Sequence, residues 1–173
     1  HWLGARIKWK VVEREGTQVA ARRLDNPLFQ RTMSLVGHPD DSNYSAQIDL
    51  LSDGNRRSMC SVGLVNQRYL IVLKGNHQEL EVSSNMEHLK VSAPFKWKVG
   101  VWYRLATRVD LEPDGTAVVR AKAWARDEPE PADWTIEVRD PHGHRNGAFG
   151  LYAFTPQSRF TAYIDNITVT PNE

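Results

Sequence analysis

The sequence predicts an all-β protein built as a two-sheet antiparallel β-sandwich. Apolar and polar residues alternate with a period of two along most of the chain, and turn-forming residues interrupt this pattern about every 8–15 residues. Apolar stripes with helical spacing never extend beyond about two turns. The 173 residues suffice for one core of useful size, so we expect a single domain over residues 1–173, as a piece of a longer protein.

Composition narrows the possible partners. Lys and Arg number 22 against 21 for Asp and Glu, so the net charge gives no reason to expect a nucleic acid partner. No run of about 18 apolar residues is present, so no membrane-spanning helix is expected. Cys60 is the one cysteine, which excludes an intrachain disulfide, and its apolar neighbours indicate an inert buried thiol.

The first half of the chain contains seven segments that are expected to form strands. Gly16 in the turn "REGT" can take a positive φ and joins the first two strands, and Gly75-Asn76 predicts a second tight hairpin. Strands are expected at residues 5–13, 18–24, 31–37, 44–52, 58–65, 68–74 and 78–84.

The second half continues in the same way, with Asp114-Gly115 as the strongest hairpin signal of the chain. Residues 85–95 give no clear pattern, and Pro94 limits any helix there. Strands are expected within residues 97–111, 117–127, 134–140, 147–154 and 160–170. No crossover helix connects them, which favours antiparallel sheets.

Four segments in order carry a resemblance to a known superfamily: "VGVWYRLATRVD", "DGTAVVRAKAWARDEPEPADW", "GAFGLYAF" and "AYIDNITVTP". Together with "NYSAQIDLLSD…CSVGLVNQRYLIVL", the region from about Asn43 to the end resembles the concanavalin A-like or laminin G-like jelly-roll superfamily. Its members include glycan-binding modules, domains attached to glycoside hydrolases and lyases, and catalytic family 16 glycoside hydrolases. The resemblance therefore implies a jelly roll, a carbohydrate partner and a secreted, periplasmic or cell-surface location, without fixing the activity.

Catalytic patterns are weak. Retaining glycosidases need two carboxyl groups about 5–5.5 Å apart, and the family 16-like members provide them from a Glu-x-Asp-x-(x)-Glu strand, which this chain lacks. Glu79 and Glu81 in "ELE" are the nearest pair on one strand face, and we interpret them as a solvated polar face. An enzyme of that type is therefore not expected.

Two tryptophans flank the segment "EPEPAD" and differ in parity. Trp134 shares the side of Ile136 and is expected in the core, whereas Trp124 lies on the polar side of its strand. An indole on a polar surface can stack on a pyranose ring while neighbouring polar groups bind the hydroxyls. The predicted carbohydrate-binding residues are Trp124, Arg120, Lys122, Arg104, Gln47, Asp49 and Tyr69.

Two alternatives to this platform stay open. Glu137 faces the same side one strand over, so Arg120 and Lys122 could form only cross-strand ion pairs. Pro129 and Pro131 of the following loop could cover Trp124. If the arginines do bind a ligand, guanidinium groups favour acidic or sulfated glycans.

Asp165 in "AYIDNITV" is the candidate metal ligand. It shares parity with Tyr163, Ile167 and Val169, which we interpret as the buried side of the last strand. Jelly rolls of the resembled superfamily often bind a structural calcium through an aspartate at this position, and Asp25 and Asn26 are expected partners among the six or more oxygens that calcium needs. A strand bulge that turns Asp165 outward is the alternative.

The sequence thus favours a non-catalytic carbohydrate-binding or accessory module that holds a poly- or oligosaccharide on its concave sheet. A protein-docking or spacer domain of a larger secreted protein is the second interpretation. A polysaccharide hydrolase or lyase with unrecognised catalytic residues is the third.

Overall fold

The structure, a computed structural model, describes residues 2–3, 8–22, 30–55, 57–84, 88–156 and 159–173, and all regular elements in these ranges longer than one residue are β-strands. The all-β prediction is confirmed. The strands are β1 (Trp2–Leu3), β2 (Trp9–Arg14), β3 (Thr17–Arg22), β4 (Arg31–Val36), β5 (Tyr44–Ser52), β6 (Ser61–Asn66), β7 (Tyr69–Lys74), β8 (Glu79–Ser84), β9 (Lys90–Pro94), β10 (Tyr103–Leu111), β11 (Ala117–Ala125), β12 (Ile136–Asp140), β13 (Phe149–Phe154) and β14 (Ala162–Pro171).

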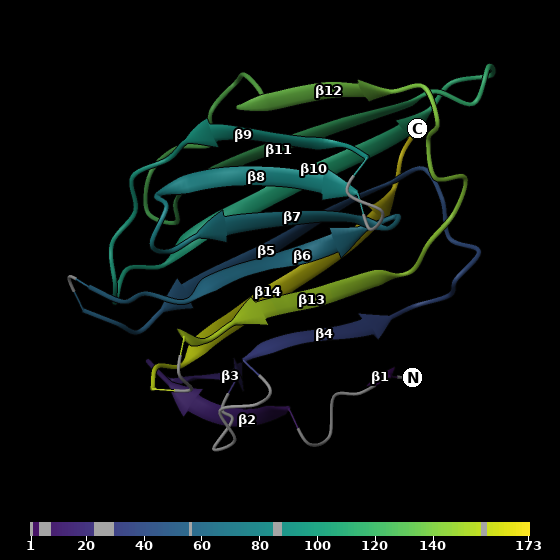
Figure 1. Cartoon of the computed structure of the whole chain (residues 1–173). Coiled ribbons are helices and arrows are strands. Elements are labelled where there is room, and N and C mark those ends of the chain that lie inside the picture. Colours follow the sequence, from purple (N-terminus) through teal and green to yellow (C-terminus); the bar gives the residue numbers. More distant parts are fainter. Residues whose placement is uncertain (1, 4–7, 23–29, 56, 85–87, 157–158) are drawn as a thin grey trace.

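The strands form two antiparallel sheets of seven, which pack face to face (Figure 1). Sheet A has the order β1-β4-β13-β6-β7-β8-β9, and sheet B has the order β12-β11-β10-β5-β14-β3-β2. Neighbours in a sheet are often distant in sequence, as β13 beside β4 and β14 beside β5. This exchange of strands between two sheets gives the predicted jelly-roll sandwich.

Alternate residues of each strand build the core between the sheets. In β5, Ile48 and Leu50 are fully buried and face Ile71 and Leu73 of β7 across one continuous apolar cluster. Strand pleating sends the intervening residues to the outer faces of the sandwich. Cys60 belongs to the same core, as predicted, and burial raises the pKa of its thiol to about 11.

Three hairpins test the turn predictions. Glu15 and Gly16 both have positive φ between β2 and β3, and Gly115 has a φ of 89° between β10 and β11, as the two turn motifs predict. The tight turn predicted at Gly75-Asn76 is wrong, because β7 ends at Lys74 and β8 begins at Glu79, which leaves a four-residue loop. Glycine is required at position 75 by close backbone packing, since a Cβ would lie 2.2 Å from the Cys60 carbonyl oxygen.

Within the described residues, no helix is long and apolar enough to cross a membrane.

Gly63 of β6 is a second position where backbone packing requires glycine. It lies on the outer side of sheet A, between Tyr152 of β13 and Val72 of β7 in register. A Cβ at this position would lie 2.0 Å from the Ile71 carbonyl oxygen. The missing side chain also leaves a depression on the outer face of the sheet.

Gly63→Ala is therefore expected to lower the free energy of unfolding by about 1–3 kcal/mol, because backbone atoms must move to admit the methyl group. Urea denaturation followed by circular dichroism measures this change. Ser92→Ala, an exposed position on the same row of the sheet, is the matched control and should change stability by less than about 0.5 kcal/mol. Equal stability of Gly63→Ala and the wild type would contradict the close approach of β6 and β7.

Candidate functional site

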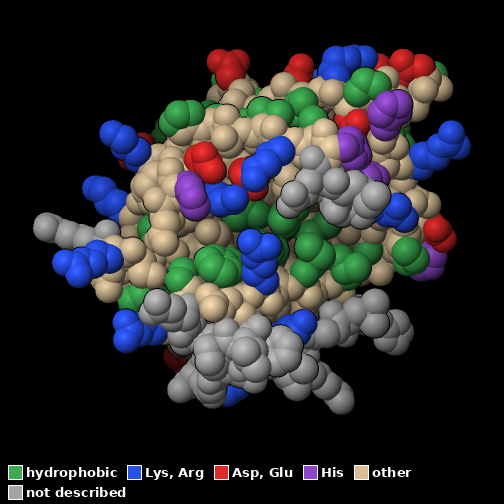
Figure 2. Space-filling view, in the orientation of Figure 1, with side chains coloured by type: hydrophobic (Ala, Val, Ile, Leu, Met, Phe, Trp, Pro, Cys, Tyr) green, Lys and Arg blue, Asp and Glu red, His purple; other side chains and the backbone are tan. Residues whose placement is uncertain are grey.

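A groove of about 680 Å³ lies on the outer face of sheet A. Apolar side chains gather in the middle of this face, with Lys and Arg side chains around them (Figure 2). The lining comes from five strands and three connecting segments: Arg31, Thr32, Met33, Leu35, Pro39, Val65, Arg68, Leu70, Ser83, Ser84, Gly147, Ala148 and Tyr152.

Two glycines explain why this face is hollow. Gly150 of β13 lies between Leu35 and Val65 in register, and Gly63 lies next to Tyr152 one row away. Large side chains therefore surround two positions that have none. Outward-facing Val65 is only 4% exposed, which is the burial expected of a concave face.

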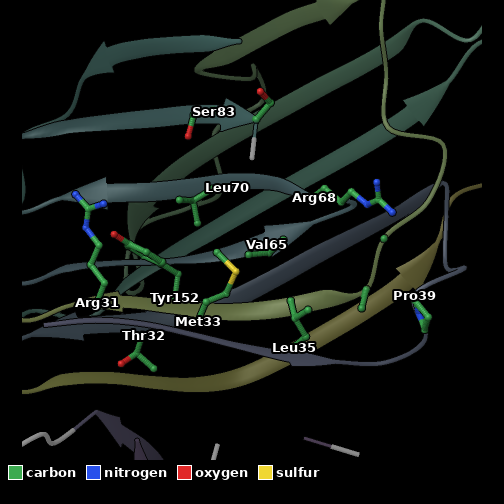
Figure 3. Close-up of a pocket in the computed structure, with 13 residues that line it drawn as sticks. Arg31, Thr32, Met33, Leu35, Pro39, Val65, Arg68, Leu70, Ser83 and Tyr152 are labelled. Carbon is green, nitrogen blue, oxygen red and sulfur yellow. The ribbon is translucent and has the colours of Figure 1, made fainter. Parts of the chain in front are cut away.

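Arginines stand at opposite ends of the groove, with the apolar floor between them (Figure 3). Arg31 begins β4 and lies across β13 near the start of β6, whereas Arg68 follows the end of β6. The six residues of β6 between these ends span about 20 Å at ~3.3 Å each. The groove is therefore long enough for several sugar units.

Neither arginine has an acidic partner within the described residues. The Arg31 guanidinium lies 5.8 Å from the centre of the Phe154 ring, a cation–π contact that leaves its N–H groups available. Arg68 is exposed at the turn between β6 and β7. Both cations can thus form bidentate hydrogen bonds with a bound carboxylate or sulfate.

The acidic residues beside the groove are already engaged or isolated. Glu81 is 6% exposed, and its Oε2 lies 2.9 Å from Lys74 Nζ and 3.6 Å from Lys90 Nζ. Glu79 is half-buried two positions earlier on the same strand face. Because two ammonium groups share the Glu81 carboxylate, this pair lacks the free acid and base that a retaining glycosidase uses.

Tyr152 is the aromatic group of the groove. Burial raises the pKa of its phenol, and the nearby Arg31 charge opposes that shift. The hydroxyl therefore stays protonated at neutral pH and can donate a hydrogen bond, while the half-buried ring offers a face for stacking.

A polar cluster bridges the two sheets at one end of the groove. The Asp140 carboxylate of β12 accepts hydrogen bonds from Tyr69 Oη (2.7 Å) and from the His142 backbone N–H (3.0 Å). Its Oδ2 also lies 3.0 Å from His88 Nε2, and His88 Nδ1 lies 3.2 Å from Ser84 Oγ. Asp140 belongs to sheet B, whereas Tyr69 and Ser84 belong to sheet A, so these bonds tie the sheets together.

Most of the predicted site residues lie together, but on the outer face of sheet B. Arg104 pairs in register with Asp49 on β5 and with Trp124 on β11. Gln47, Lys122 and Arg120 lie on the same face in the next rows. The prediction that these residues share a surface is therefore correct.

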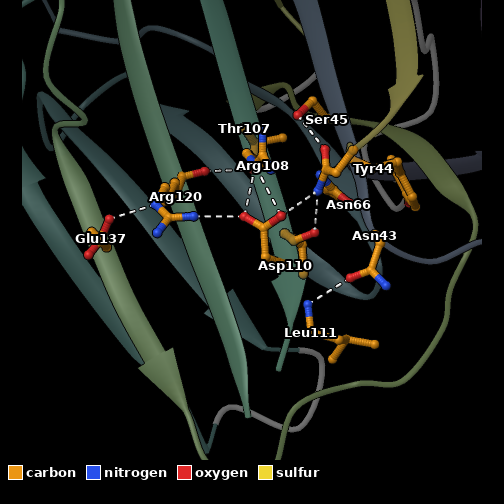
Figure 4. A network of polar contacts seen from close by, with 12 residues as sticks. Asn43, Tyr44, Ser45, Asn66, Thr107, Arg108, Asp110, Leu111, Arg120 and Glu137 are labelled. Atoms are coloured by element: carbon orange, nitrogen blue, oxygen red, sulfur yellow. Dashed lines mark hydrogen bonds and ion pairs between the residues drawn. The ribbon is translucent and has the colours of Figure 1, made fainter. Parts of the chain in front are cut away.

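Ion pairs occupy the charged members of this surface. Arg104 Nε lies 2.8 Å from Asp49 Oδ1, and Asp49 is fully buried. Arg120 bridges Asp110 (2.7 Å) and Glu137 (2.6 Å), and Figure 4 shows this chain of contacts. The alternative that Arg120 forms a cross-strand ion pair with Glu137 agrees with this geometry, whereas Lys122 pairs with Glu130 of the loop after β11.

The expected contrast between the two tryptophans is wrong. Trp124 does face away from the core, but it is 5% exposed, and Arg104 and Lys122 lie within 6 Å of its ring. Trp134 does not reach the core, because β12 begins only at Ile136 and the strand parity does not extend to residue 134. Trp134 is half-buried on the outer face of sheet B, beside Lys122.

Two further predictions need correction. Tyr69 is fully buried, because its strand parity turns it into the core toward Asp140, and it lies on the other sheet from Trp124. Asp165 faces outward with Tyr163, whereas Ala162 and Ile164 face the core, and the strand register shifts after Asp165. The outward direction of the alternative is therefore observed, and the bulge lies directly after Asp165.

The described surroundings of Asp165 do not test the calcium prediction. Its Oδ2 accepts a hydrogen bond from Thr17 Oγ1 at 3.3 Å, and its register partner Asp49 is already bound by Arg104 and Asn166. No three His, Cys, Asp or Glu side chains converge as a metal-binding group among the described residues. Asp25 and Asn26 lie outside the described residues, so calcium stays a prediction.

Sequence reasoning missed Arg31, Arg68 and Tyr152. The available signal was glycine inside the strand patterns "SVGLV" and "FGLYAF", which marks a close backbone approach or a missing side chain.

The polar cluster gives a pH prediction. Burial raises the pKa of Asp140, but hydrogen bonds from Tyr69, His88 and the His142 N–H together lower it by more than burial raises it. The folded pKa of Asp140 therefore lies below the ordinary value. A carboxyl group with a depressed pKa stabilises the fold above its unfolded pKa of about 3.9 and loses this contribution as the pH falls through the folded value. Asp140→Asn should cost about 1–3 kcal/mol at pH 7.

Urea denaturation between pH 7 and pH 2 measures this effect. The wild type should lose stability below pH about 4, and Asp140→Asn should show a flatter decline there. Asp127→Asn, an exposed loop carboxylate, is the control. Parallel profiles for Asp140→Asn and the wild type would show that Asp140 contributes no pH-dependent stability.

Comparisons with known proteins support the fold and leave the activity open. No family model matches the sequence, and no curated protein matches it either. The carbohydrate-binding module CBM66 from Bacillus subtilis is similar in structure, with a TM-score of 0.68 and 18% identity over 97% of this chain and 94% of that one.

Two lyases are also similar. The PL-14 alginate lyase from Aplysia kurodai has a TM-score of 0.63 at 7% identity, over 99% of this chain and 90% of the lyase. The endo-β-1,4-glucuronan lyase from Trichoderma reesei has a TM-score of 0.55 at 11% identity, over 96% and 89% of the two chains. At such identities the likeness establishes the fold alone, and that fold is the concanavalin A-like jelly-roll sandwich.

Proposed function

We propose that the groove of sheet A binds a stretch of an acidic polysaccharide without cleaving it. The observation that carries this proposal is the pair Arg31 and Arg68, which have no acidic partner among the described residues and lie at the two ends of a concave apolar floor. Each guanidinium can bind one carboxylate or sulfate, and the distance between them suits two separated sugars of one chain.

The floor between the arginines suits the other surface of a sugar chain. Tyr152 can stack on the C–H face of a pyranose, and Met33 and Leu70 extend the apolar surface. Ser83 and the phenol of Tyr152 can hydrogen-bond ring hydroxyls. The names of similar structures, a carbohydrate-binding module, an alginate lyase and a glucuronan lyase, favour glycans of this kind as first probes.

A binding role is favoured over hydrolysis because Glu81 is held by Lys74 and Lys90. An accessory glycan-binding module also needs access to polysaccharide, so the expected secreted, periplasmic or cell-surface location and attachment to a longer protein belong to the same proposal. The protein-docking interpretation lacks a comparable observation, since the groove presents charges suited to a polyanion.

Binding of alginate and glucuronan oligosaccharides tests the proposal by isothermal titration calorimetry. Arg31→Ala and Arg68→Ala should each weaken binding by about tenfold or more, from the ~1.5–3 kcal/mol of a charge-assisted hydrogen bond. Tyr152→Ala should weaken it as well, whereas Tyr152→Phe should retain most of the stacking. Binding by the wild type should weaken as salt is raised.

Lys10→Ala is the matched control, because it removes one positive charge from the exposed face of β2 on sheet B. Equal affinities of this variant and both arginine variants would place binding outside the groove. Release of unsaturated or reducing-end products from either polysaccharide would contradict the non-catalytic role.

A further inference from the structure

Trp134 is more accessible than the four other tryptophans whose burial the structure describes. It is half-buried, whereas Trp9, Trp97, Trp102 and Trp124 are at most 8% exposed. It stands beside a hollow of about 250 Å³ on the outer face of sheet B, opposite to the groove. We call this hollow the Trp134 pocket; its lining is Ser45, Ala46, Gln47, Ala106, Thr107, Glu130, Trp134, Thr168 and Thr170.

A small residue creates the depth of the Trp134 pocket. Ala106 of β10 lies in register between Gln47 of β5 and Lys122 of β11, so one row of the sheet has a methyl group between two long side chains. Thr168 continues this row on β14. The outcome is a shallow depression with the indole of Trp134 as one wall.

The polar groups of the pocket are available to a ligand. Gln47, Thr168 and Thr170 make no side-chain hydrogen bond within the described residues, although each carries donors and acceptors. An amide and two hydroxyls can therefore exchange water for the hydroxyl groups of a bound molecule without breaking an internal contact.

Lys122 holds the indole in place before any ligand arrives. Its ammonium lies 4.8 Å from the centre of the Trp134 ring, donates to the Pro131 carbonyl at 2.7 Å and pairs with Glu130 at 2.7 Å. Lys122 is 6% exposed, so its buried ammonium holds the Trp134 ring in this orientation. An aromatic wall that is already oriented loses little entropy on binding.

We propose that the Trp134 pocket binds one neutral sugar ring, as a second glycan site on the face opposite to the groove. The indole offers a stacking surface and the Gln47 amide and threonine hydroxyls offer hydrogen bonds, which is the combination that pyranose recognition uses. The volume is below the ~300–1,000 Å³ of sites for larger ligands, so it suits one ring. The pocket prefers a neutral sugar because Lys122 already neutralises Glu130, leaving no unpaired cation in the lining.

The test is ¹⁹F nuclear magnetic resonance of protein labelled with 5-fluorotryptophan, with Trp134→Phe used to assign the resonance of Trp134. The probes are cellobiose, maltose, mannobiose, lactose and sucrose at millimolar concentration, and an alginate oligosaccharide as the charged probe. At least one neutral disaccharide should shift the Trp134 resonance in a saturable way, with the resonance of buried Trp124 unchanged. Gln47→Ala should raise the dissociation constant about fivefold or more, a loss of ~1 kcal/mol for one hydrogen bond.

The groove variant Arg31→Ala separates this proposal from the proposed function. The neutral-sugar shift should persist in Arg31→Ala, even if alginate binding is lost or never occurs. Absence of a saturable Trp134 shift with all neutral probes would overturn the proposal. A shift seen only with alginate and abolished by Arg31→Ala would also overturn it, because Trp134 would then report on the groove.

Discussion

Strand pleating is the constraint on which the whole molecule depends, since each sheet can give only one of its two faces to the shared core. Ile48, Leu50 and Ile71 lie on the inner faces and are fully buried. Every second residue is left on an outer face, where the other sheet gives no cover. What the protein can bind therefore depends on which partners the outward-facing side chains of each sheet have.

The basic side chains on the two outer faces differ in their ion-pair partners. On sheet B, basic side chains find acidic partners within the protein, as Arg104 does with Asp49 and Arg120 with Asp110 and Glu137. Loss of one member of such an ion pair would leave the other charge poorly solvated and would lower the stability of the fold. On sheet A, Arg31 and Arg68 lack such partners among the described residues, and glycines keep the surface between them low. The acidic groups of a ligand would pair with the arginines of sheet A, as internal carboxylates pair with the arginines of sheet B.

The sequence allowed the strands and much of sheet B to be predicted, because alternation and hairpin registers are local properties. The parity of Trp124 and the Arg120–Glu137 pair followed from them. Burial of Trp124 did not follow, because it depends on how Arg104 of the neighbouring strand and Lys122 of its own strand lie over the ring. Trp134 was misplaced because parity was extended two residues before the true start of β12. Asp165 was misplaced by a bulge, which reverses parity after it without a clear local signal.

The groove itself was beyond local reasoning for a related reason. Its lining comes from strands that are distant in sequence, such as β4 and β13, and only the sheet order brings Met33 beside Tyr152. Arg31 and Arg68 are ordinary residues at strand ends until that order is known. Gly63 and Gly150 did carry a signal, but a glycine in a strand indicates a missing side chain without saying which face of the sandwich becomes hollow.

Amide chemical-shift mapping of the ¹⁵N-labelled protein with an alginate tetrasaccharide tests the central claim most directly. The account predicts that the shifts gather on β4, β6, β7, β8 and β13, with the largest changes near Arg31, Arg68 and Tyr152. Shifts that gather on β5, β10 and β11 of sheet B, or no saturable shifts with any acidic oligosaccharide, would contradict it.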